Sequence, residues 1–321
     1  MSFRKFSNLP FELQLQVWEA YLAQPAMHIF DVCYHSLRGG TCAEKAFGSC
    51  VETKDKERYE RYRNTVFLDR LDCDAGNGMS IDPSMYHFTN SLCLAPRTVA
   101  KTIKAILSRQ EINKVYLPGR DQTLTIPTSD VLFLRFRPPS DNHANLAAEV
   151  LLYPSPIKEI LEGQWSAEIA STLQNTKRIA LGVTDTWAAG LSPELGSDEV
   201  AYFSCTVYKG LEVLYLVDEC AGRCLECGRE ELKTGGLRGR SRLWRELQSK
   251  GTNEDRDGDV IQGFGRRYVE VFDLEKLGWD SEHPSYLFAK MMGDSVRNLQ
   301  CGPDEGRFQG VRVLMVEDEI E

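Results

Sequence analysis

Apolar positions recur with a helical period near the start of the chain. Residues 10–22 place four apolar side chains on one helical face, namely Leu13, Val17, Trp18 and Tyr21. Residues 98–108 predict a second amphipathic helix, and residues 28–34 predict a strand between the two helices. Because each helix has an apolar side to bury, we expect the two helices to form a pair.

The pattern changes after residue 110 to short apolar runs separated by turns or helices. Strands are predicted over residues 114–117, 130–136, 177–183, 211–218, 267–272 and 311–316, and helices over residues 157–173, 241–249 and 284–297. The run at 211–218 is almost continuously apolar, which suits a strand covered on both faces. The recurring unit of strand, helix and strand predicts an α/β (α+β) fold with one continuous sheet, similar to an irregular leucine-rich repeat array.

Two stretches lack such periodicity and are rich in glycine and charge. They cover residues 36–90 and 220–259, and we expect both to be inserted loops, the second around the one short helix. The chain is thereby divided into a helical region at 1–110, which contains the first insertion, and a repeat-like α/β region at 111–321, which contains the second.

Net charge and hydropathy exclude several classes of partner. The 321 residues include 38 Lys and Arg against 47 Asp and Glu, a formal net charge of -9 that makes nucleic acid an unfavourable partner. The first 22 residues lack the apolar core of a signal peptide, and no apolar run is long enough to span a bilayer. We expect no membrane contact and a cytoplasmic or nuclear location.

The opening segment FSNLPFELQLQVWEAYL combines a Leu-Pro pair, a Glu-Leu pair and a later hydrophobic-Trp pair. The positions concerned are Phe6, Leu9, Pro10, Glu12, Leu13, Val17 and Trp18. This arrangement resembles the first motif of the fungal two-ExR domain family, an F-box-like group mostly without assigned function. The family's second motif, Cys-Arg-Glu-Ser-Arg, is matched here by Cys93 and Arg97.

Both Glu-x-Arg motifs are degenerate in this chain. Gln14 replaces the arginine of the first, and Ala95 replaces the glutamate of the second. If the family's paired charges link its two helices, these helices must be held by packing alone or by Glu12 reaching Arg97. The later segments DVLFLRF, KRIALGV, LEVLYLVDE and GFGRRYVEVF follow in the order expected of the family, so the resemblance covers the chain apart from the two insertions.

The resemblance implies an F-box-like helix pair followed by a leucine-rich-repeat-like sheet, and a non-enzymatic intracellular protein-interaction module. An F-box-like helix would dock a Skp-type adaptor of a ubiquitin ligase through a short apolar surface. In this chain that surface comprises Leu9, Pro10, Leu13, Val17 and Trp18. The same side chains can instead be core contacts between the helix and the rest of the fold, and the sequence leaves both interpretations open.

The chain has ten cysteines, of which Cys220, Cys224 and Cys227 are closely spaced. Their spacing is compatible with three thiolate ligands of a zinc ion, with Cys205 or His283 as a fourth ligand, and equally with unligated loop cysteines. A small metal-binding protein or an enzyme with a site at this loop is therefore the alternative to an interaction module.

Recognisable catalytic motifs are absent from the sequence. The five histidines show no metal-ligating spacing, and no phosphate-binding Gly-Lys-Ser/Thr loop occurs. We therefore predict no catalytic residues and no cofactor apart from the zinc considered above.

Overall fold

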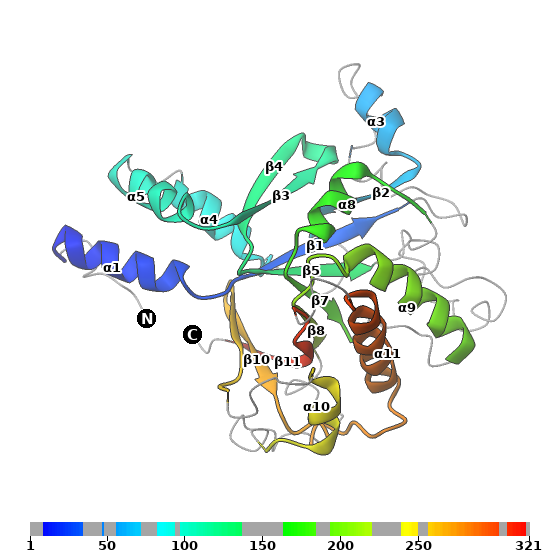
Figure 1. Cartoon of the computed structure of the whole chain (residues 1–321). Coiled ribbons are helices and arrows are strands. Elements are labelled where there is room, and N and C mark those ends of the chain that lie inside the picture. The colour runs from blue at the N-terminus through cyan, green and yellow to red at the C-terminus, as the bar shows by residue number, and fades with distance from the viewer. Residues whose placement is uncertain are drawn as a thin grey trace.

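The fold is known from a computed structural model (Figure 1). It describes residues 9–34, 47, 56–71, 82–93, 97–136, 163–183, 193–219, 239–249, 256–301 and 307–318. The strands are β1 (Met27–Cys33), β2 (Thr65–Arg70), β3 (Ile112–Leu117), β4 (Gln122–Pro127), β5 (Val131–Phe136), β6 (Gln164–Trp165), β7 (Arg178–Gly182), β8 (Val213–Asp218), β9 (Val260–Gly263), β10 (Arg266–Val271) and β11 (Gly310–Asp318). The helices are α1 (Phe11–Leu22), α3 (Lys56–Tyr62), α4 (Met85–Cys93), α5 (Arg97–Leu107), α8 (Ala167–Gln174), α9 (Pro193–Val207), α10 (Arg242–Leu247) and α11 (Pro284–Leu299).

One large, mostly parallel sheet organises the described residues. Its strand order is β6-β2-β1-β5-β7-β8-β11-β10-β9, and the five central strands β1, β5, β7, β8 and β11 run parallel in chain order. Strand β2 is antiparallel to β1, β10 is antiparallel to β11, and β9 is antiparallel to β10. The predicted α/β class is confirmed, and the sheet takes strands from both the 1–110 and the 111–321 region.

The sheet is curled, so that its edge strand β9 contacts the chain just before β1. The Gln262 amide of β9 donates to the Pro25 carbonyl just before β1 (2.9 Å), and Ala26 pairs with Gln262 in a parallel bridge. The inner face therefore encloses an apolar cluster contributed by seven strands and Leu71: Met27, Ile29, Leu71, Val131, Phe133, Ala180, Val213, Tyr215, Val217, Ile261, Tyr268, Leu314 and Val316. This closure distinguishes the sheet from an open solenoid, whose terminal strands stay apart.

Helices α8, α9, α10 and α11 cover the outer face, where Figure 1 shows α9 beside α11. Alternate strand residues such as Leu134 and Leu216 point outward and pack against helical residues such as Phe203 and Met292. The Ser204 hydroxyl of α9 also donates to the Met292 thioether of α11 (3.4 Å). Both faces of the central strands are thus buried, which explains their continuous apolar runs.

Several predicted elements lie close to the observed ones, but three predictions are wrong. The strands do not form one continuous sheet, because β3 and β4 pair in a separate two-stranded sheet. The expected loop at 36–90 contains α3, β2 and α4 in its described parts. The helix predicted over 157–173 does not include Trp165, which pairs with Val66 in β6; α8 begins only after Ser166, whose hydroxyl accepts from the Ile169 amide (3.3 Å). Residues 151–162 lie outside the described part of the chain.

Helices α1, α4 and α5 extend from one side of the sheet, and α3 lies at a different corner of the molecule (Figure 1). Helix α5 contacts both α1 and α4. Within the described ranges, no helix is both long enough and apolar enough to cross a membrane.

Candidate functional site

The predicted partner-binding residues lie on and just before α1. The helix begins after Pro10, whose carbonyl accepts from the Leu13 amide (3.0 Å), and the Gln14 side chain donates to the Leu9 carbonyl (2.8 Å). Glu12 lies in the first turn, where the helix dipole favours a negative charge.

One side of α1 rests on the rest of the chain. The Tyr21 ring meets the Phe88 ring of α4 edge to face, with centroids 5.4 Å apart, and the Gln110 amide donates to the Leu22 carbonyl (3.4 Å). Trp18 is half-buried on this side. No residue of α1 is fully buried, so the helix is attached to the molecule along one side only.

The other side of α1 presents apolar side chains to solvent. Leu9, Leu13 and Val17 follow each other at intervals of four residues and are 37%, 44% and 41% exposed. We call these three residues the α1 surface. Of the predicted partner-binding set, Leu9, Pro10, Leu13 and Val17 are exposed and only Trp18 is half-buried. Isolated exposed apolar residues are common, but a row of them along one helix is characteristic of interaction surfaces.

The second family motif is described only in part. The side chains of Cys93 and Arg97 and the whole of Ala95 lie outside the described residues, so the predicted contact between Glu12 and Arg97 is not tested. Helix α1 contacts α5 and also reaches Phe88 of α4, and the F-box-like arrangement of the helix pair stays a prediction.

The predicted metal loop also lies outside the described residues, since Cys220, Cys224 and Cys227 fall between 219 and 239. Of the proposed fourth ligands, Cys205 is exposed on α9, and the His283 ring stacks on Trp279 with centroids 4.9 Å apart. Elsewhere in the described ranges, no three His, Cys, Asp or Glu residues are grouped to hold a metal ion. The zinc site stays a prediction, which the zinc content of protein purified without chelator tests.

A cluster of buried charges joins β9, β10 and β11 on the inner face. Arg312 pairs with Asp259, which also accepts from the Tyr215 hydroxyl (2.6 Å). Arg256 pairs with Glu270, which also accepts from the Trp244 indole (3.2 Å). Because each arginine in this cluster faces a carboxylate, we interpret the cluster as a structural feature that holds the sheet edge.

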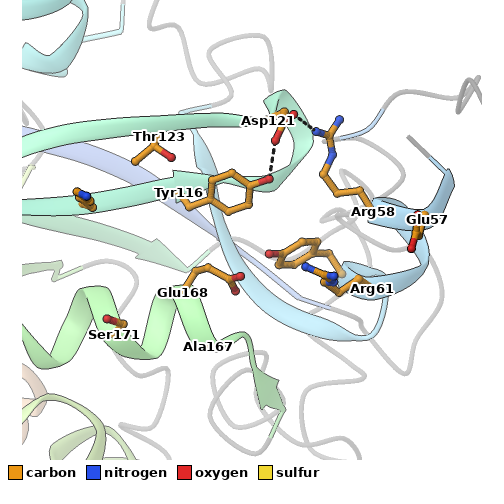
Figure 2. Close-up of a pocket in the computed structure, with 11 residues that line it drawn as sticks. Glu57, Arg58, Arg61, Tyr116, Asp121, Thr123, Ala167, Glu168 and Ser171 are labelled. Atoms are coloured by element: carbon orange, nitrogen blue, oxygen red, sulfur yellow. Dashed lines mark hydrogen bonds and ion pairs between the residues drawn. The ribbon is translucent and has the colours of Figure 1, made fainter. Parts of the chain in front are cut away.

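A groove of about 760 Å³ lies between α3, the β3–β4 hairpin and α8 (Figure 2). Its lining residues are Glu57, Arg58, Arg61, Tyr62, Lys114, Tyr116, Asp121, Thr123, Ala167, Glu168 and Ser171. Every one of them except Ala167 carries a charge or a hydroxyl group, so such groups are distributed along the whole groove.

Asp121 fixes one end of this groove. Its φ is 49°, and among the residues that the structure describes it is the one non-glycine residue with a positive φ. Its carboxylate accepts from the Tyr116 hydroxyl (2.8 Å) and pairs with Arg58 (2.8 Å). These two hydrogen-bonding partners lower the pKa of Asp121, because both stabilise the carboxylate.

The Tyr62 hydroxyl lies deeper in the groove. Burial is the main cause that raises the pKa of Tyr62 to about 12, the nearby Glu168 carboxylate acts in the same direction, and Arg61 acts in the opposite direction. Tyr62 therefore stays protonated at neutral pH and carries Glu168 and Arg61 beside it.

The sequence pattern missed this groove because α3 was interpreted as part of a loop. The segment KERYERY has only one buried residue, Tyr62, and shows little apolar periodicity. A signal was nevertheless present, because Glu57 and Arg61 are spaced as a helical i, i+4 pair of opposite charge.

Comparison of the whole chain with protein-family models, with curated proteins and with solved structures finds no match. The geometry described above is therefore the basis for assigning a function.

Proposed function

We propose that this protein is a non-enzymatic protein-interaction module that binds a partner through the α1 surface. The carrying observation is that Leu9, Leu13 and Val17 form an exposed apolar row on a helix attached to the molecule along its opposite side. Burying one such side chain fully contributes roughly 1.5–3 kcal/mol, and because about two-fifths of each is still exposed, the row would supply only part of the binding free energy and the partner must bury further surface.

The proposed occupant is a Skp-type adaptor of a ubiquitin ligase. This choice rests on the resemblance of the segment from Phe6 to Trp18 to the two-ExR family, whose F-box-like helix would use the same positions. In this proposal α1 and α5 are the F-box-like helix pair. The five parallel strands with their outer helices resemble a leucine-rich-repeat array in their chain order, although the sheet is closed, and they present a target protein.

The exposure of these side chains favours docking over a core role. A core contact loses its solvent exposure within the chain itself, as Phe203 of α9 does. Leu13 and Val17 keep about two-fifths of their surface in water, and the half-buried Trp18 supplies the attachment of the helix.

The experiment is a pull-down and titration of the full chain with purified Skp-type adaptor. We expect the double substitution Leu13→Gln and Val17→Gln to weaken binding at least about tenfold, because polar amides replace two apolar anchors. The matched control is Tyr202→Gln on α9, which alters an apolar side chain that is 52% exposed far from α1. Failure of the unsubstituted chain to bind the adaptor, or equal binding by the double variant and the control, would contradict the proposal.

A further inference from the structure

The polar groove is built by three elements that are distant in the sequence. Helix α3 contributes Arg58 and Arg61, the β3–β4 hairpin contributes Lys114 and Tyr116, and α8 contributes Glu168. Figure 2 shows Arg58 and Arg61 towards one end, Thr123 and Ser171 towards the other, and Tyr116 and Glu168 between them. The groove lies away from α1, on the side of the sheet that carries α3 (Figure 1).

Charged groups in this groove differ in whether they are paired. Arg58 is held by Asp121 at one end. Glu57, Arg61, Lys114 and Glu168 form no ion pair with any residue in the part of the chain that the structure describes, and all four line the same groove. Glu57 lies at the outer end in Figure 2, so Arg61, Lys114 and Glu168 are the charges along the rest of the groove that are available to a ligand of complementary charge.

The available charges follow one another along the groove. Lys114 and Tyr116 lie on the same face of β3, separated by two residues or about 6.6 Å, with Lys114 further from Asp121. The Lys114 carbonyl accepts from Thr172 (2.9 Å), which places it beside the Ser171 end of α8. In Figure 2, Glu168 lies between Arg61 at one end of the groove and Ser171 at the other. The order is positive at Arg61, negative at Glu168 and positive at Lys114.

The side chains around these charges are held in place. The Tyr116 hydroxyl is fixed by Asp121, and the Tyr62 ring packs against Phe67 and Tyr116 with centroids 5.8 and 6.3 Å away. The positive φ of Asp121 places an uncommon backbone conformation on the groove's rim, and such conformations concentrate at binding sites. A site of this kind needs little rearrangement on binding.

We propose that this groove binds a short peptide segment of a partner protein that has an acidic side chain at each end and a basic side chain between them. The acidic side chains pair with Arg61 and Lys114, and the basic side chain pairs with Glu168. A peptide fits better than a small metabolite because small-molecule pockets enclose most of their ligand, whereas this groove is open to solvent at Arg61 and Lys114, which are both exposed. Thr123 and Ser171 add hydroxyl groups that can bond to a peptide backbone.

The test uses the full chain and fluorescein-labelled, end-capped peptides with a Gly-Ser frame. In the first series, each peptide has a lysine between two glutamates that are four, five or six positions apart. In the second series the charges are inverted, so that a glutamate lies between two lysines at the same spacings. We expect at least one Glu-Lys-Glu peptide to bind at least tenfold more tightly than its inverted counterpart in fluorescence anisotropy. Binding should weaken as salt rises, because the contacts are ionic.

Two charge reversals locate the site. Lys114 is exposed, and Lys114→Glu should weaken binding of the preferred peptide at least tenfold. A peptide with lysine in place of the glutamate at that end should then bind this variant better than the original peptide does. Arg61→Glu should do the same for the opposite end. The control Lys101→Glu reverses an exposed charge on α5, outside the groove, and should leave binding unchanged.

Equal affinity for the two peptide series, or an unchanged affinity in Lys114→Glu, would overturn the proposal. If Arg61→Glu lowers the melting temperature, Lys114→Glu and its reversed peptide still decide the outcome. The groove and the α1 surface are tested separately, so a negative result here leaves adaptor binding unaffected.

Discussion

Asp69 shows how a single buried carboxylate shapes the pH dependence of the fold. It lies on β2 directly opposite Asp31 of β1, and Asp31 is already paired with Arg135 (2.8 Å). The nearest guanidinium to Asp69 in an ion pair is that of Arg120, at 3.9 Å. Burial is the main cause that raises the pKa of Asp69 to about 6, and the Asp31 charge acts in the same direction.

The consequence is a prediction for Asp69→Asn. Because the pKa of Asp69 is higher in the folded than in the unfolded state, ionising Asp69 lowers the stability of the fold. Its contribution to the free energy of unfolding is largest below about pH 4 and falls as the pH rises to about 6. Above that pH, this group causes no further change. The neutral amide should therefore raise the free energy of unfolding at pH 7 by roughly 1–2 kcal/mol and have little effect at pH 4. Urea denaturation at both pH values measures this.

Asp257→Asn is the matched control, because Asp257 is exposed and should change the free energy of unfolding by less than about 0.5 kcal/mol at either pH. A loss of stability in Asp69→Asn at pH 7 would show that the carboxylate of Asp69 is stabilising and that this account of its environment is wrong.

At the scale of elements, the central strands were predictable and the peripheral ones were not. Strands β5 and β8 are buried on both faces, so their sequences are nearly continuous apolar runs, interrupted in β5 by Arg135, and such short runs are typical of buried strands. Polar and apolar residues alternate only weakly in β4, and β9 has only four residues, so the sequence pattern does not distinguish either strand from a turn. Helix α9 is buried through Val200, Phe203 and Val207 at helical spacing, but glycine and acidic residues in its first half hide that pattern.

The candidate site was predictable to the same limited extent. The sequence placed Leu13, Val17 and Trp18 on one helical face, but it could not tell which flank of that face the chain itself covers. The structure covers the Trp18 flank and leaves the Leu13 flank open. The groove depends on α3, the hairpin and α8 meeting in space, which no local pattern reports.

We therefore expect substitutions on the two flanks of α1 to change the free energy of unfolding by different amounts. Leu13→Gln should change the free energy of unfolding by no more than about 0.5 kcal/mol, because the side chain is exposed. Trp18→Ala should lower it by roughly 1–3 kcal/mol, since the half-buried indole attaches α1 to the molecule. Thermal and chemical denaturation of both variants measure the difference. If Leu13→Gln is as destabilising as Trp18→Ala, then Leu13 is a core residue and the α1 surface is not free for a partner.

At the scale of the whole molecule, the contact between β9 and the start of β1 joins segments more than 200 positions apart. The inner cluster depends on this closure, because it combines Met27 and Ile29 of β1 with Ile261 of β9 and Tyr268 of β10. Residues from the two ends of the chain thus share one core, and we expect them to unfold together in a single transition.

Ile261→Ala tests this coupling. Ile261 is completely buried, so removing its outer carbons should lower the free energy of unfolding by roughly 2–4 kcal/mol. Hydrogen exchange followed by mass spectrometry should show protection falling in β1 as much as in β9, because both strands open with the same cluster. Ile112→Ala, at a side chain that is 45% exposed on β3, is the control and should leave protection in both strands unchanged. Loss of protection confined to β9, with β1 unaffected, would mean that the sheet edge opens independently and that the closure does not unite the fold.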